Sequence, residues 1–333
     1  MTTELMSLVV RLNIVAAAAI VFVLVLRGMA RQRLGADRAY GLWLAVPLAV
    51  AGAVFPPATA AGPAGALEAD LGHGAAWLSD GRHGAALAAI WGLGVVWRIG
   101  LAAWRYASFL GRAKAGRAGP AVVGIFAPRL VTPLDFTRRF TPEERRLVRA
   151  HERAHMDRLD PRYNSVVLAI QCLNWFNPLV HAAARAITLD QELACDAAVM
   201  ARFPAERRRY VQTLLRCQAA MIGSPLGCGW SCGGAHPLVA RVAALTHRRA
   251  EDRPRNPGTI PLVAVWLAAF AVAWTTQPPS RPPQRPNVVL VDLTPSAIAG
   301  PQDQAALWDA LSRTEGASHP VQTRSISPRR TAP

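Results

Sequence analysis

Acidic residues are scarce in this chain. Among its 333 residues, 21 Asp and Glu stand against 37 Lys and Arg, and the formal net charge is +16 at pH 7. A strongly basic chain indicates nucleic acid as a partner, but the sequence has neither a DNA-reading motif nor a basic strip interleaved with aromatic residues. The arginines instead flank apolar segments and follow predicted helix surfaces. We therefore expect contact with anionic lipid headgroups and no direct binding of nucleic acid.

Cysteine is also sparse, and a disulfide framework is not expected. All 5 cysteines fall in residues 111–256, the segment that the charge pattern assigns to the reducing cytosol. A second metal site at Cys228 and Cys232, in a glycine-rich loop, is one interpretation of their proximity. Their spacing is loose and no matching His/Cys pair follows closely, which favours ordinary loop cysteines.

Long apolar segments are abundant, and four of them can reach the length of about 20 residues that a bilayer core requires. They cover about residues 5–26, 39–55, 85–110 and 257–276. The first has neither the basic start nor the small-residue cleavage site of a secretory signal, so we expect it to be retained. For the second and third segments a buried core helix is the alternative, and Arg98 and Arg105 interrupt the third.

Arginine placement predicts the orientation of these spans. The loop at residues 27–38 is rich in arginine, the loop at 56–84 is mainly acidic, and the segment 111–256 is crowded with arginine. The positive-inside rule then places the amino terminus outside, the segment 111–256 in the cytosol, and the tail after Thr276 outside. The chain is therefore expected to cross a plasma membrane several times.

The pattern H-E-x-x-H at His151–His155 carries the clearest chemical signal. Two histidines four apart on a helix face the same side, where they can bind one zinc ion with Glu152 beside it as general base. The helix itself is well marked, because Thr141 can cap it, Pro142 suits its first turn and Glu144 completes a capping box. A solvated helix that carries two histidines by chance is the alternative reading.

Catalytic zinc needs a third protein ligand and an open position for water. A helix predicted from Asn177 to about Met200 carries Glu192 and Asp196, four residues apart on one face. An antiparallel return of the chain can bring Glu192 to the histidines. Asp196 can then orient one of the histidine rings from behind.

Four other residues compete with Glu192 for this role. His181 shares its helix face but lies about 16 Å away along the helix, so the two cannot bind one ion. Cys195 points about 60° away from the direction of Glu192, and a buried thiol is its commoner role. Asp157 and Asp160 follow the motif too closely to fold back easily, and capping is their expected role. Glu192 is therefore the favoured third ligand.

Three segments together resemble the membrane metallopeptidases of the BlaR/MecR type, which are bacterial β-lactam-sensing signal transducers and their relatives. They are H-E-x-x-H-x-x-x-x-D at 151–160, Trp-Phe-Asn-Pro-Leu at 175–179 and Glu-Leu-Ala-Cys-Asp at 192–196. Residues 122–133, and the group His236, Pro237, Leu238, Arg241 and Val242, look similar to further segments of that family. The resemblance covers about residues 85–275.

This resemblance implies a gluzincin-like zinc fold in which His151, His155 and Glu192 bind Zn²⁺ and Glu152 acts as base. It also implies a protease of the bacterial plasma membrane that acts on a cytosolic protein, such as a transcriptional repressor or the chain itself. The tail at residues 277–333 departs from the β-lactam sensors, because it is rich in proline and has no Ser-x-x-Lys. β-Lactam sensing by acylation is therefore not carried over, and the tail is expected to be largely disordered.

The predicted fold is a mainly α membrane protein with four transmembrane helices, three of them in residues 1–110, and a cytosolic helical zinc-metallopeptidase domain at 111–256. Two short strands, about 121–126 and 130–134, are expected to form a small β-hairpin. Its edge can hold an extended peptide, or the hairpin is a structural lid over the helices.

The predicted function is that of a zinc-dependent endopeptidase in signal transduction. The rival is a membrane signalling or scaffold protein whose structural zinc site cleaves nothing. Glu152 argues against this rival, since a structural site needs no base next to the metal. A transporter is a third option, weakened by the presence of only four spans and no repeat. No sequence feature indicates an oligomeric state.

Overall fold

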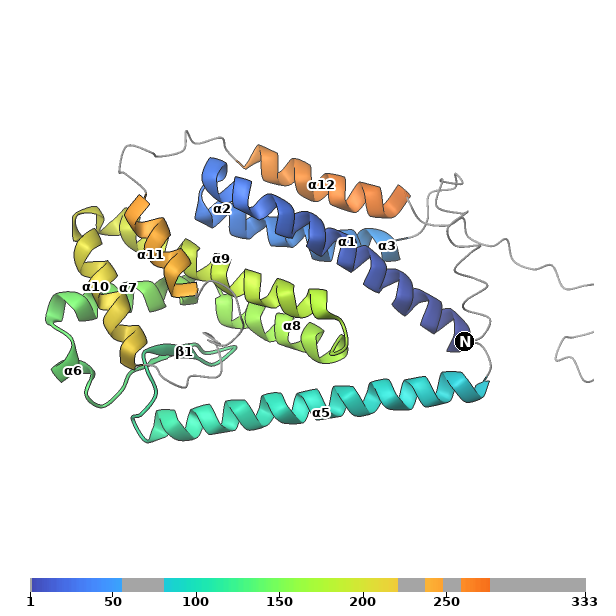
Figure 1. The fold of residues 1–333 in the computed structure, drawn as a ribbon, viewed down its shortest axis with the longest axis horizontal. Coiled ribbons are helices and arrows are strands. Elements are labelled where there is room, and N and C mark those ends of the chain that lie inside the picture. The colour runs from blue at the N-terminus through green and yellow to red at the C-terminus, as the bar shows by residue number, and fades with distance from the viewer. Residues whose placement is uncertain (1, 56–80, 221–236, 248–258, 276–333) are drawn as a thin grey trace, which may run out of the picture. The chain divides into compact units, whose positions relative to one another are not determined.

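The computed structural model describes residues 2–55, 81–220, 237–247 and 259–275, all within one compact unit, Met1–Pro279. The fold is mainly helical and carries one small antiparallel sheet (Figure 1). Three groups of predicted features lie outside these residues. They are the pair Cys228 and Cys232, His236, and the tail at 277–333.

Two helices dominate the amino-terminal third of the chain. Helix α1 covers Thr2–Leu34 and helix α5 covers Gly81–Lys114. Within them, Leu8–Leu34 and Ala85–Lys114 are long and apolar enough to cross a membrane. Most of the apolar side chains of α5 are exposed, which fits a helix that meets lipid rather than a protein core.

The prediction of four spanning helices is corrected to two candidate spans in the described part of the chain. The second predicted span is divided into α2 (Ala36–Gly41), a 3₁₀ turn η1 (Leu42–Leu44) and α3 (Ala45–Val54). Pro47 explains the interruption, because its ring cannot accommodate a regular helical turn before it. The fourth, α12 (Ile260–Thr275), has 16 residues and is about 24 Å long, short of a bilayer core of about 30 Å.

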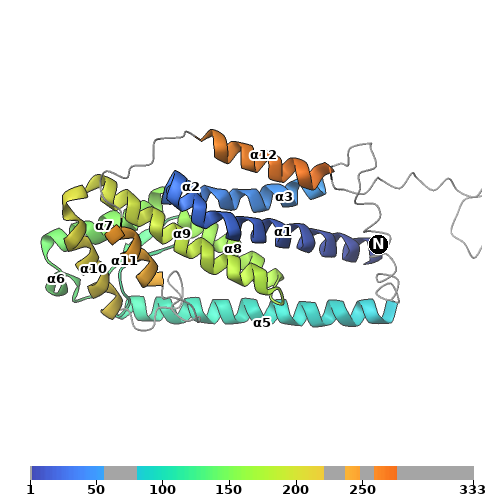
Figure 2. The same cartoon turned by 45° about the horizontal axis from the view of Figure 1, so that its top comes forward.

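Helix α9, Pro178–Arg202, lies against these amino-terminal helices over its first half (Figure 1, Figure 2). Buried apolar residues from α1, α2, η1, α3, α9 and α12 form one cluster there. They are Ile20, Val23, Ala30, Ala39, Leu42, Trp43, Ala45, Val180, Ala183, Ala186 and Leu262. The second half of α9 continues beyond this cluster into the helices that follow α5, so one helix joins both parts of the fold.

The predicted hairpin is present but shorter than expected. Strand β1 (Ala121–Val123) pairs antiparallel with β2 (Arg129–Val131), with Val122 opposite Leu130. Gly124 follows β1 at a φ of 102°, a conformation that glycine adopts without strain and that ends the strand early.

The predicted capping box of the motif helix is confirmed. Helix α7 covers Pro142–Asp157, its first turn follows Thr141, and the Thr141 and Glu144 side chains bond each other's backbone N–H groups. A short helix α6 (Phe136–Arg139) precedes it and α8 (Asp160–Leu173) follows it.

After α9, a 3₁₀ turn η2 (Pro204–Glu206) leads to α10 (Arg207–Ala220), and α11 covers Pro237–His247. Four helices, α7, α9, α10 and α11, meet around a second apolar cluster. Its buried members are Leu147, Val199, Tyr210, Leu214 and Leu245. Because Leu147 and Val199 are almost fully buried, this cluster fixes the angle at which α7 and α9 cross, and with it the position of the site.

Candidate metal centre

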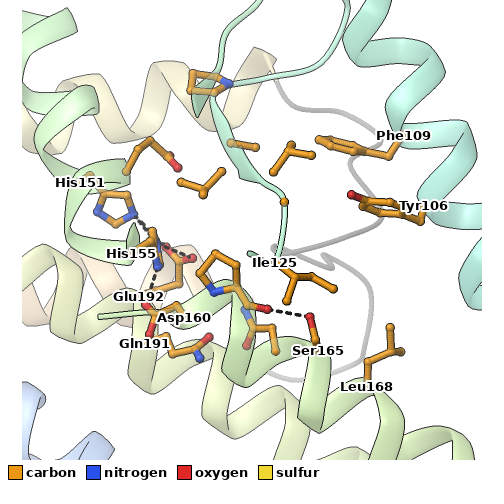
Figure 3. Close-up of a pocket in the computed structure, with 18 of the residues that line it drawn as sticks. Tyr106, Phe109, Ile125, His151, His155, Asp160, Ser165, Leu168, Gln191 and Glu192 are labelled. Carbon is orange, nitrogen blue, oxygen red and sulfur yellow. Dashed lines mark hydrogen bonds and ion pairs between the residues drawn. The ribbon is translucent and has the colours of Figure 1, made fainter. Parts of the chain in front are cut away.

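The structure brings together the three side chains predicted to bind a metal. His151 and His155 project from successive turns of α7, and Glu192 reaches them from α9 (Figure 3). The two Nε2 atoms are 3.2 Å apart. Glu192 places Oε2 3.3 Å from His151 Nε2 and Oε1 3.6 Å from His155 Nε2. One ligand atom from each residue therefore lies within 4.8 Å of the other two.

The tautomers of the two histidines fit a metal ion. His155 Nδ1 lies 2.7 Å from Oδ2 of Asp160, and His151 Nδ1 lies 2.9 Å from the hydroxyl of Tyr210. When both Nδ1 atoms donate to these oxygens, the two Nε2 atoms are left to bind a metal, which would replace the proton that His151 otherwise carries. Two converging lone pairs and a carboxylate form the donor set that zinc prefers.

A buried network supports His151 from behind. The Tyr210 hydroxyl accepts from His151 Nδ1 and donates to Asp196 Oδ1 at 2.6 Å. Asp196 also lies 3.3 Å from His151 Nδ1. Arg241, on α11, donates to Asp196 from Nε at 2.8 Å and from Nη2 at 2.7 Å, and its Nη1 lies 2.7 Å from Glu192 Oε2. Asp196 thus stands where the sequence placed it, next to a histidine ring.

The charges of this network call for a further cation. Burial opposes ionisation of Asp196, but Arg241 and His151 hold its pKa at about 2. Burial likewise opposes the charge of Glu192, yet Arg241 and the histidines keep its pKa well below the ordinary value. Two buried carboxylates, Asp196 and Glu192, share the guanidinium of Arg241, while Asp160 lies 3.9 Å from Nε of Arg158. Burial lowers the pKa of His151, but the bonds to Asp196 and Glu192 overcome this and raise the pKa to about 10, so a proton supplies positive charge where a divalent ion fits.

Asp160 corrects one prediction. Its carboxylate caps no helix but binds Nδ1 of His155, and its side chain is almost fully buried. Leu159 immediately before it has a φ of 60°, an uncommon conformation for a branched side chain. This turn directs Asp160 back toward the motif helix. Asp157 instead forms an exposed ion pair with Arg153.

Cys195 and His181, the other competitors for the ligand position, occupy different environments. Cys195 Sγ lies 3.4 Å from His155 Nδ1 and 3.7 Å from Asp160 Oδ2. Burial raises the pKa of this thiol, so it faces the outer side of His155 as a neutral group. His181 bonds to Gln171 and donates Nε2–H to the carbonyl of Trp175, at the turn between α8 and α9.

A cavity of about 720 Å³ opens beside the two histidines, and Glu152 lines it. Its other walls come from α5, β1, α8 and α10. Among them are Ile99 of α5 and Val122 and Val123 of β1. Tyr106 and Phe109 of α5 and Ser165 and Leu168 of α8 also line it (Figure 3). The cavity is mostly apolar, and the groups that can react gather at its end near the histidines. This arrangement provides space for a polypeptide segment next to a general base.

Sequence reasoning missed two parts of the site. Tyr210 carries no spacing signal that links it to the motif, because its position depends on the crossing angle of α10. Arg241 was noticed only as part of a segment that resembles the family. In the structure, Arg241 is the one arginine of α11, Pro237–His247, and it is buried, and a buried arginine needs a carboxylate partner.

Comparison with known proteins identifies the family of this chain. The family model described as BlaR1 peptidase M56 matches residues 7–69 and 113–245, more than half of the chain. The chain is also similar to the regulatory protein BlaR1 of Bacillus licheniformis, with 31% identity over 81 residues, which are 24% of this chain and 13% of that protein. No solved structure matches the chain. The matched residues contain the helices that carry His151, His155 and Glu192, and the chain belongs to the BlaR1 peptidase family, M56.

Proposed function

We propose that this chain is an integral-membrane zinc endopeptidase that cleaves a cytosolic protein as a step in signal transduction. One observation carries the proposal: His151, His155 and Glu192 converge on one point at the end of a cavity that Glu152 also lines. The proposed substrate is a transcriptional repressor or the chain itself. The aligned part of the BlaR1 relative is too small to transfer the substrate of that protein.

The roles of the residues follow from their positions. His151, His155 and Glu192 would hold Zn²⁺, which would supply Lewis acidity to a scissile carbonyl and to a water molecule. Glu152 would accept a proton from the attacking water and pass it to the leaving amine. Asp160 on one side, and Tyr210 with Asp196 on the other, keep the two imidazoles in the tautomer that binds a metal.

The substrate would enter as an extended chain. Residues of β1 line the cavity and β1 contacts α7, while β1 pairs with β2 along one edge. An extended peptide can bond to the free edge of such a strand. This supports the peptide interpretation of the hairpin over that of a lid.

A structural zinc site is the alternative. Structural sites are closed by four protein ligands. Among the described residues, the group that contains both histidines has three ligands, and it borders an open cavity. This favours a catalytic site.

The test uses full-length protein in liposomes, with zinc content and cleavage of a quenched peptide library as separate readouts. The parent is expected to contain one zinc and to cleave. Glu152→Gln is expected to keep the zinc and to lose about 10²- to 10⁴-fold in rate. Glu143→Gln, an exposed glutamate on the same helix, is the matched control and should behave as the parent. Cleavage by Glu152→Gln at the parental rate, or a parent without zinc, would refute the proposal.

A further inference from the structure

We infer that α8 and the first half of α9 enter the lipid bilayer as a re-entrant hairpin, with the exposed face of α8 against lipid acyl chains. The prediction that residues 111–256 are wholly cytosolic does not include such a hairpin. Composition, contacts, surface and backbone bonding each support the inference, and none of them depends on the catalytic role of the site.

The composition of the hairpin differs from its surroundings. Residues 163–184 contain no Asp, Glu, Lys or Arg, and they lie between Arg162 and Arg185. The rest of the segment 111–220 is dense in arginine. An uncharged run of this length is near the about 20 residues that one crossing of a bilayer core requires. Folded as a hairpin, it reaches part of the way and returns to the same side.

Helix α1 shows how deep the hairpin reaches. At the turn, Asn177 Nδ2 donates to Asn13 Oδ1 at 3.3 Å. Asn13 lies fourteen residues before Arg27, the first arginine at the basic end of this span, which is about 21 Å along the helix axis. Farther along the hairpin, Val180 and Ala183 of α9 pack in the cluster that contains Ile20 of α1. The turn is therefore about 21 Å from the basic end of α1, at the level of Asn13 in the amino-terminal part of the candidate span Leu8–Leu34.

Helix α5 gives a similar depth from the other side. Trp91 Nε1 donates to the carbonyl of Leu173 at 2.8 Å, and Trp175 Nε1 donates to the carbonyl of Trp91 at 3.3 Å. Trp91 is about 21 Å from Arg105 along α5, and still about 10 Å from Arg98. Both views of the fold show the turn between α8 and α9 beside α5 and α1 (Figure 1, Figure 2).

The outer face of α8 is apolar and exposed. Tyr163, Val166, Ile170 and Leu173 follow one another at spacings of three and four residues, which is one stripe of a helix, and Leu173 at its end also borders the cavity. Their exposed fractions are 52%, 58%, 43% and 46%, and Phe176 at the turn is 51% exposed. In water this continuous stripe would favour aggregation. Acyl chains would cover these apolar side chains without any protein partner. Because α8 lies between two candidate spans, lipid is the surrounding that we infer for this stripe.

The turn also meets the requirement that lipid imposes on irregular backbone. Polar groups that leave regular helix at membrane depth must be bonded within the protein. The Leu173 carbonyl accepts from Trp91, and the Trp175 carbonyl accepts from His181. The Asn174 side chain bonds the Ile170 carbonyl, and the Asn177 side chain accepts from the N–H of Leu179. This also gives His181 a role, as a donor to the turn.

The hairpin also borders the cavity of the candidate metal centre. Ser165, Leu168 and Cys172 of the hairpin line the same cavity as Glu152 and His151. The candidate metal centre therefore lies near the membrane surface, and its cavity extends toward the hydrocarbon between α8 and α5.

The test is photocrosslinking of full-length protein in liposomes of phosphatidylethanolamine and phosphatidylglycerol. Val166→p-benzoylphenylalanine probes the stripe. Val239→p-benzoylphenylalanine on α11 is the matched control, because both valines are 58% exposed. Mass spectrometry should find lipid adducts at position 166 at least tenfold above those at 239. Equal yields at the two positions, or adducts of position 166 with a second copy of the chain, would overturn the inference.

A second variant keeps the inference testable if the variant at position 166 does not fold. Phe176→p-benzoylphenylalanine keeps an aromatic ring at the turn and should also give lipid adducts. Its adducts should fall on acyl chains rather than headgroups, since the turn is deep. Adducts confined to headgroups would place the turn at the surface and contradict a re-entrant hairpin. Neither zinc content nor cleavage enters this readout, so it can fail while the proposed function holds.

Discussion

Arg241 Nη1 lies 2.7 Å from Glu192 Oε2, and both side chains are buried. The same guanidinium holds Asp196 with its other nitrogens. A single cation on α11 therefore fixes a proposed metal ligand and the carboxylate behind His151. Its planar fork serves two carboxylates at once, which the point charge of a lysine cannot do.

Replacement of Arg241 should damage both stability and metal binding. Arg241→Met leaves two buried carboxylates without their cation, which costs about 3–5 kcal/mol. Arg241→Lys should retain only part of this stability. Arg153→Met is the control, because Arg153 and its partner Asp157 are 67% and 63% exposed, where such a pair contributes about 0–1 kcal/mol. Thermal unfolding in detergent and zinc content measure the difference. Equal losses in the two Met variants would contradict the role of Arg241.

Asp160 and Cys195 both touch the outer side of His155, but they should differ in effect. Asp160→Asn keeps the shape and removes the charge that fixes the His155 tautomer, so zinc affinity is expected to fall about 10- to 100-fold. Cys195→Ser should change zinc affinity little, because the neutral thiol lies at 3.4 Å from Nδ1 and not on the Nε2 side. Competition with a fluorescent zinc chelator measures both. A larger loss for Cys195→Ser would indicate that the group His155, Asp160 and Cys195 holds the ion.

Cys217 should report the charge of the cavity through its pH dependence. Burial, and then the carboxylate of Glu152, raise the pKa of this thiol from 9.0 to about 12. The thiolate is the reactive form, so alkylation by iodoacetamide should be slow at pH 8 and should still be rising at the highest pH at which the protein stays folded. Glu152→Gln removes the second cause and should move the profile to lower pH. Peptide-level mass spectrometry distinguishes this cysteine from the others. An unchanged profile in the variant would mean that Glu152 is not charged near Cys217.

Local sequence rules predicted which helices and strands surround the motif, but they predicted the lengths of the elements less well. The capping box at Thr141 and Glu144 depends on residues three apart, and it is present. The spans were overcounted because hydropathy alone does not register the interruption before Pro47 or the short length of Ile260–Thr275. Apolar residues in a helix that packs on other helices look the same as residues that face lipid.

The candidate site was predictable where a helix period determines the geometry, and not where it depends on tertiary packing. His151 and His155 share a face by periodicity, and Glu192 followed from an antiparallel return of the chain. Tyr210 and Arg241 reach the site only through the way in which α10 and α11 pack on α7 and α9. Asp160 was assigned to a cap because the unusual φ of Leu159, which turns it back, has no signature in the sequence.

Gly94 offers a test of the joint between α5 and the hairpin. A Cβ at this position would fall on the indole ring of Trp175, closer than van der Waals contact allows, whereas a Cβ at Gly92 would meet nothing within 4 Å. Alanine is the better helix former by about 1 kcal/mol, so Gly92→Ala should stabilise the protein slightly. Gly94→Ala should destabilise it by about 1–3 kcal/mol, because the indole ring must move and loosen its bond to Trp91.

Gly92→Ala and Gly94→Ala should therefore change the stability of the protein in opposite directions. Thermal unfolding of full-length protein in detergent measures both. Combining Gly94→Ala with Trp175→Phe should recover part of the loss, since the smaller ring leaves room for the methyl group, and the recovery appears as coupling in a double-mutant cycle. If Gly94→Ala and Gly92→Ala change stability equally, then Trp175 does not pack on Gly94, and α5 is not clasped to the turn between α8 and α9.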